Sequence, residues 1–136
     1  MKFKFQQPQG DLLFEWTKQA VPKGAKRMER DAHGRFVLAV SEVKGHTHAI
    51  YDPGVIAYML DNGNMILDVR EASQEKPVRI VGGTDEAHRL RLDAGPGTVP
   101  LPGEGHFPVY ITEPGLYDVT RQREIDPWGE WQQATD

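Results

Sequence analysis

Glycine and proline interrupt this chain so often that a long helix is hard to place in it. The chain has 14 glycines and 10 prolines in 136 residues, and Pro22 and Gly24 break any long helix over residues 18–30. Between these breaks lie short apolar and β-branched segments that are typical of strands. We therefore expect an all-β fold of many short strands, in a single domain over residues 1–136.

Segments 55–60 and 65–70 are predicted to pair as an antiparallel hairpin. The intervening DNGN contains Asn62 and Gly63, which can supply the positive φ angles of a tight turn, and either face of the hairpin could be buried. Further strands are predicted at 11–16, 36–43, 78–81, 88–92, 109–112 and 116–121. Asp126 before Pro127 predicts a short C-terminal helical turn. The predicted architecture is an antiparallel β-barrel or sandwich, with a jelly roll favoured.

Composition narrows the classes of function. The chain has no cysteine, which excludes disulfides, thiolate nucleophiles and cysteine-bound zinc. It has no apolar run approaching the roughly 20 residues that cross a bilayer, so we expect a cytoplasmic protein. Residues 1–35 carry eight Lys/Arg and four Asp/Glu, whereas the remaining residues carry eight and sixteen. This asymmetry suits a homo-oligomer or an acidic protein partner, and no nucleic-acid partner is expected.

Histidines give the clearest chemical signal. His46 and His48 lie two residues apart, so in a strand they would project from one face about 6.6 Å apart. His106 also follows a glycine and precedes an apolar segment, which makes it the third candidate ligand of a metal site. Asp52 and Glu104 are the carboxylates nearest in sequence to the two histidine segments. Zn, Fe, Mn or Ni would suit three imidazoles with a carboxylate or water.

Other interpretations of these residues stay open. An HxH pair can be a polar stripe on the solvent side of a strand. His88 is expected at the surface and His33 in a turn. Asp85 and Glu86 are expected in a polar loop, and no nucleophile or general base is identifiable beside the proposed ligands.

Trp128 and Trp131 lie three residues apart near the C-terminus, which places them on one face of a helical turn. Two such side chains are expected to bury against the body of the protein, another subunit or a partner.

The histidine segments resemble the two sequence motifs of cupins. The HTH of 46–48 is followed by three residues and then Asp52, and Gly95, Gly103 and His106 fall at the intervals of the second motif. Leu101 and Tyr110 depart from that motif. The resemblance implies a β-barrel in which His46, His48 and His106 bind a metal ion, with Asp52 as a fourth ligand.

The whole chain is also similar to a group of small uncharacterised bacterial and phage-borne proteins. The shared segments are GHTH at 45–48, HFP at 106–108 leading to GLY at 115–117, and RQREIDP at 121–127, where Ile125 replaces the tyrosine of the group. This resemblance implies no reaction, and it adds a virion-associated location as an alternative.

Two hypotheses of function follow from the sequence. One is a small β-barrel protein with a three-histidine metal site, in a binding or structural role or as a cupin-like enzyme. The other is a phage or mobile-element interaction protein that assembles through its termini without a metal.

Overall fold

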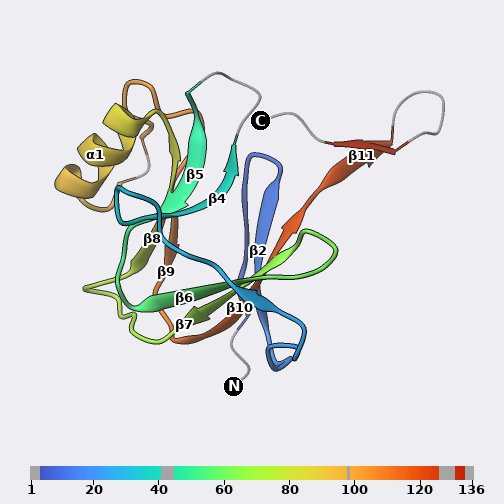
Figure 1. Ribbon diagram of the computed structural model, residues 1–136. Coiled ribbons are helices and arrows are strands. Elements are labelled where there is room, and N and C mark those ends of the chain that lie inside the picture. The colour runs from blue at the N-terminus through green and yellow to red at the C-terminus, as the bar shows by residue number, and fades with distance from the viewer. Residues whose placement is uncertain (1–3, 41–44, 98, 126–130, 134–136) are drawn as a thin grey trace.

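The computed structural model describes residues 4–40, 45–97, 99–125 and 131–133, which form two main antiparallel sheets and one helix (Figure 1). The larger sheet has the order β1-β2-β10-β7-β6-β3 and the smaller one β4-β5-β8-β9. Strands of the larger sheet are β1 (Gln6–Gln9), β2 (Leu12–Thr17), β3 (Lys26–Arg27), β6 (Val55–Met59), β7 (Met65–Val69) and β10 (Gly115–Arg121). Strands of the smaller sheet are β4 (Phe36–Val40), β5 (Thr47–Ile50), β8 (Val78–Gly83) and β9 (Val109–Ile111).

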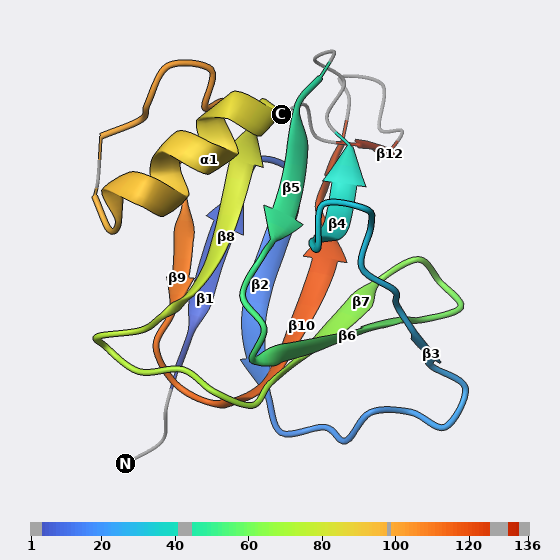
Figure 2. The same cartoon turned by 60° about the vertical axis from the view of Figure 1, so that its left-hand side comes forward.

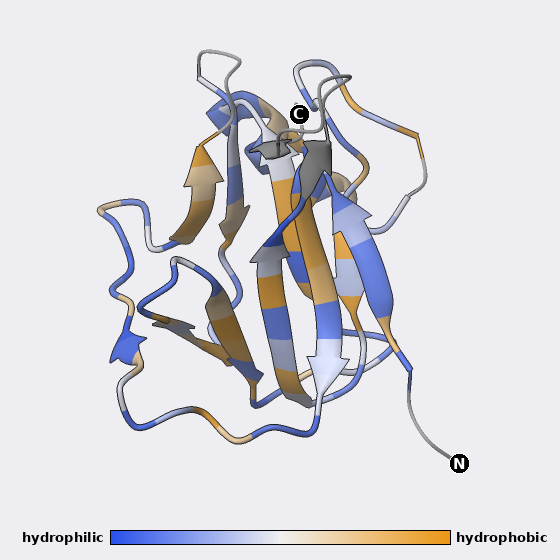
Figure 3. Cartoon of the chain, turned by 90° about the vertical axis from the view of Figure 1, so that its right-hand side faces the viewer, coloured by the Kyte–Doolittle hydropathy of each residue, from blue (hydrophilic) through white to orange (hydrophobic). Residues whose placement is uncertain are grey.

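Apolar side chains from both sheets form one core. Phe14 of β2, Ile80 of β8 and Tyr117 of β10 are completely buried within it. Hydrophobic and hydrophilic residues alternate along the strands (Figure 3), which is the pattern of sheets with one face toward a core. The prediction is therefore confirmed in part: the chain is mostly β, with two antiparallel sheets, and it also has one short helix. Since the hydrogen-bonded order of the described strands gives open sheets, the barrel and jelly-roll details stay predictions.

The predicted hairpin is confirmed. β6 pairs with β7 from Val55↔Val69 to Met59↔Met65. Only Gly63 has a positive φ in the connection, at 88°, and its N–H donates to the Leu60 carbonyl. This is a type I turn followed by a left-handed glycine, the three-residue form of hairpin loop, rather than a turn with two positive φ angles.

The predicted strand at 88–92 is wrong. This segment belongs to α1 (Asp85–Ala94), which lies over the outer face of the smaller sheet (Figure 2). Thr84 caps the helix by accepting a hydrogen bond from the N–H of Ala87, and Asp85 and Glu86, expected in a loop, form its acidic first turn. The alternation of HRLRL was misleading because the buried face of the helix is partly polar: Ala87, His88 and Arg91 are its buried residues.

At the C-terminus, β11 (Arg123–Ile125) pairs with β12 (Trp131–Gln133) as a separate two-stranded sheet. Trp131 therefore begins a strand rather than a helical turn. The predicted helix start at Asp126 lies outside the described residues, and so does Trp128, the other tryptophan of the predicted pair.

Candidate functional site

His48 lies inside the sandwich. Along β5, His48 and Ile50 face the larger sheet and are buried, whereas Thr47 and Ala49 face the side that α1 covers. The His48 side chain is 1% exposed. A polar ring at this depth needs a hydrogen-bond partner, because an unpaired buried polar group is costly.

Gln9 of β1 supplies that partner and connects the two sheets. Its Nε2 donates to the carbonyl oxygens of Ile80, at 2.9 Å, and Phe107, at 3.1 Å. Carbonyls only accept, so the amide nitrogen must face them and Oε1 must face His48 Nδ1, which lies 2.8 Å away. Nδ1 therefore carries the proton. In the neutral ring the lone pair is on Nε2, as in metal-binding histidines whose other nitrogen is hydrogen-bonded.

His106 lies beside His48, in the loop before β9. The two ring centroids are 5.5 Å apart and the ring planes differ by 15°. This separation exceeds that of direct face-to-face stacking. Near-parallel rings at this distance are offset-stacked, so both would bind one ion at about 2.0–2.1 Å per nitrogen only after a ring turns.

His46 approaches the same loop from the start of β5. A Cβ atom on Gly105 would lie 3.2 Å from His46 Nδ1, so a glycine at position 105 allows this approach. The three histidines predicted as ligands are thus gathered around one loop. Among the residues that the structure describes, however, no group of three or more His, Asp or Glu side chains is arranged to hold a metal ion.

Glu104, the carboxylate next to this loop, is engaged elsewhere. Its Oε2 and Oε1 accept hydrogen bonds from Arg91 Nε and Nη2 at 3.0 and 2.6 Å, and Oε1 also accepts from the N–H of Leu101. The side chains of Arg91 and Glu104 are 3% and 1% exposed. This buried ion pair joins α1 to the loop that carries His106, so Glu104 positions the loop.

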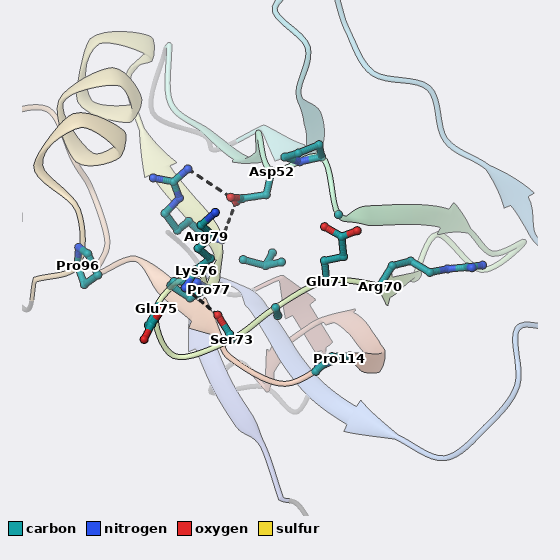
Figure 4. A pocket seen from close by; sticks show the side chains of 14 residues that line it. Asp52, Arg70, Glu71, Ser73, Glu75, Lys76, Pro77, Arg79, Pro96 and Pro114 are labelled. Carbon is teal, nitrogen blue, oxygen red and sulfur yellow. Dashed lines mark hydrogen bonds and ion pairs between the residues drawn. The ribbon is translucent and has the colours of Figure 1, made fainter.

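Asp52, the other predicted carboxylate ligand, lies beyond the opposite end of β5 from His46. Its Oδ2 accepts from the backbone N–H of Arg79, and its Oδ1 pairs with the Arg79 guanidinium at 3.2 Å. Figure 4 shows this pair on the wall of a pocket of about 720 Å³, with Pro77, Pro96 and Pro114 also in its lining. The chain therefore separates Asp52 from the histidine segments that flank it in sequence.

A second histidine-centred cluster was not expected from the sequence. His88 of α1 is 0% exposed, and its Nε2 lies 3.0 Å from the carbonyl oxygen of Thr47. Its Nδ1 lies 3.1 Å from the Tyr51 hydroxyl and 3.4 Å from Arg35 Nη1. Because burial lowers the pKa of His88, the ring is neutral at neutral pH.

Arg35 completes this cluster. Its guanidinium pairs with Asp31 and with Asp85 at 2.7 Å each, and Nη1 also donates to the Tyr51 hydroxyl at 3.2 Å. The hydrogen bond from Arg35 is the main cause that lowers the pKa of Asp85. The cluster was missed because His88 was placed in a strand. Thr84 followed by two acidic residues was the available signal for a helix start.

Comparison with known families places the chain. Residues 8–122 match the family described as "Domain of unknown function (DUF8820)". The chain belongs to this family. No curated protein and no solved structure matches it. Among the residues that the structure describes, no helix is long and apolar enough to span a membrane.

Proposed function

We propose that this domain binds a divalent transition-metal ion, with His48, held by Gln9, and His106 as two ligands and His46 as a third. The observation that carries the proposal is the Gln9 contact, which gives His48 the Nδ1–H tautomer beside a second imidazole. His46 and His106 are half-buried, so both side chains are partly accessible to an ion from solvent.

A binding or structural role suits this cluster better than a cupin-like reaction. Glu104 and Asp52 are each bonded to an arginine, and neither carboxylate is therefore available as a ligand or as a general base. Water would complete the coordination of Zn, Fe, Mn or Ni.

The test is metal stoichiometry of protein prepared without a histidine tag. After equilibration with Zn²⁺ or Ni²⁺ and removal of excess, we expect about one ion per chain by elemental mass spectrometry. His106→Ala and His46→Ala should each lose the ion, whereas His33→Ala, a change at an exposed turn, should keep it.

Retention of the ion by both site variants, or its absence from the wild-type chain, would overturn the proposal. If the wild type binds no ion but native mass spectrometry shows an oligomer, the mobile-element interaction role would be the better account.

A further inference from the structure

Tyr51 lines a groove of about 600 Å³ between α1 and the turn that contains His33. The lining of the groove shares no residue with the proposed metal site. Helix α1, which forms one side of the groove, lies on the outer face of the smaller sheet (Figure 2). Its volume falls within the range of small-molecule sites.

Hydrogen bonds fix the direction of proton sharing at Tyr51. The Thr47 carbonyl can only accept, so His88 Nε2 carries the proton and Nδ1 of the neutral ring holds the lone pair. Nδ1 therefore accepts from the Tyr51 hydroxyl. Arg35 Nη1 donates to the same hydroxyl oxygen, where negative charge would develop if the proton moved to His88.

This arrangement matches that of an activated nucleophile. A hydroxyl contacts a base, the base is oriented by a third group, and a cation lies beside the oxygen. We propose that Tyr51 is a nucleophilic phenol with His88 as its general base, acting on a small substrate that carries a positive charge and an activated acyl group. Thr47 and Arg35 are positioning residues.

The charge of the groove selects the substrate class. Glu86 and Asp93 line it together with Asp85, which is paired with Arg35, and Arg89 is the only Lys or Arg among the lining residues that the structure describes. An excess of carboxylates favours a cationic ligand.

The chemical step balances with these groups alone. The Tyr51 oxygen forms a bond to the acyl carbon, its proton passes to His88 Nδ1, and the bond to the leaving group breaks. The leaving group departs with the bonding electron pair and can take the proton from His88.

An aryl sulfonyl fluoride tests this reactivity without knowledge of the substrate. The phenol oxygen bonds to sulfur, fluoride leaves, and His88 accepts the proton. We would treat the full-length protein with 4-(2-aminoethyl)benzenesulfonyl fluoride, a cation, and with neutral benzenesulfonyl fluoride, and map the modified residues by peptide mass spectrometry. General-base assistance predicts that Tyr51 reacts roughly a hundredfold faster than Tyr58, a half-buried tyrosine of β6. The cationic reagent should show the larger preference.

Variants assign the roles. Tyr51→Phe should abolish the fast modification, and His88→Gln should reduce the rate at Tyr51 to that of Tyr58. Equal rates at Tyr51 and Tyr58 in the wild type would overturn the proposal, as would a Tyr51 preference that His88→Gln leaves intact. If His88→Gln does not fold by circular dichroism, the wild-type ratio decides. An equal preference for both reagents would overturn the assignment of a cationic substrate.

Discussion

Two buried histidines, one in β5 and one in α1, lie on opposite faces of the smaller sheet, and their tautomers are opposite. His48 faces the interior of the sandwich and donates from Nδ1 to Gln9. His88 reaches the outer side from α1 and donates from Nε2 to the Thr47 carbonyl. The nitrogen that keeps the lone pair is therefore Nε2 in one ring and Nδ1 in the other.

The neighbours of that lone pair determine what each histidine can do. Beside His48 lies a second imidazole, which suits an ion shared between nitrogens. Beside His88 lie a phenol and a guanidinium, which suit proton transfer. Two histidines thus support different chemistry because a different ring nitrogen donates the hydrogen bond in each, and the other nitrogen keeps the lone pair.

The largest expected effect is that of Glu104→Ala, which should disturb the histidine cluster of the sandwich interior and leave the His88 cluster in place. Glu104→Ala leaves the Arg91 charge buried without its partner, which should reduce the free energy of unfolding by about 3–5 kcal/mol. Metal stoichiometry should fall because the loop that carries His106 is no longer held in position. Modification of Tyr51 should persist in the folded fraction. Denaturant unfolding and peptide mapping measure both effects.

Asp68→Asn is the control for Glu104→Ala, since it removes a more exposed ion pair with Arg70 and should cost no more than about 1 kcal/mol. Equal losses of stability in the two variants would contradict the structural role assigned to the buried pair.

A smaller effect is expected at the contact that fixes the His48 tautomer. Gln9→Met removes the hydrogen bonds of the side-chain amide to His48 and to two carbonyls. This loss should lower the free energy of unfolding by about 1–3 kcal/mol. Loss of the Nδ1 acceptor should weaken metal affinity by about 10–100-fold, measured by calorimetry. Gln7→Met, at an exposed position of the same strand, should change neither quantity.

The pH dependence of stability should report His88. Its folded pKa is lowered by burial, with Arg35 adding to the effect and Asp85 opposing it. As pH falls below about 6.5, the ordinary value, the unfolded chain binds the proton first, and the free energy of unfolding therefore decreases. Urea titrations from pH 8 to 5 should show this decrease in the wild type. It should be weaker in His88→Gln and unchanged in His33→Gln, and an identical slope in all three would exclude His88 as the source.

The smallest expected effect concerns His46. Gly105→Ala places a methyl group 3.2 Å from His46 Nδ1, the end of a side chain that can move by a few tenths of an ångström. Stability should change by less than about 0.5 kcal/mol, while metal affinity falls because His46 is displaced. Gly24→Ala, where nothing lies within 4 Å, should leave the affinity unchanged.

The sequence by itself determined most of the strands. Segments with β-branched and apolar residues between glycine and proline breaks became β2, β4, β6, β7, β8, β9 and β10, because these signals are local. The hairpin over 55–70 and the position of its turn were predictable for the same reason, although the turn has one positive φ angle and not two. Which of its faces is buried was not: Val55 and Ala57 of β6 join the core, whereas Ile56 and Tyr58 are half-buried on the other side.

Only the tertiary structure decided the partners of the polar residues. His46, His48 and His106 could be grouped from the sequence by their glycine-flanked segments, and the loop does bring His106 beside His48. The sequence could not show that Asp52 and Glu104 are engaged elsewhere, because distance along the chain does not reveal their ion pairs with Arg79 and Arg91. Gln9 lies 39 residues from His48 and 71 from Ile80, and the His88 cluster joins a turn, a strand and a helix. Such hydrogen bonds depend on how separate elements pack, and no local pattern of residues encodes that packing.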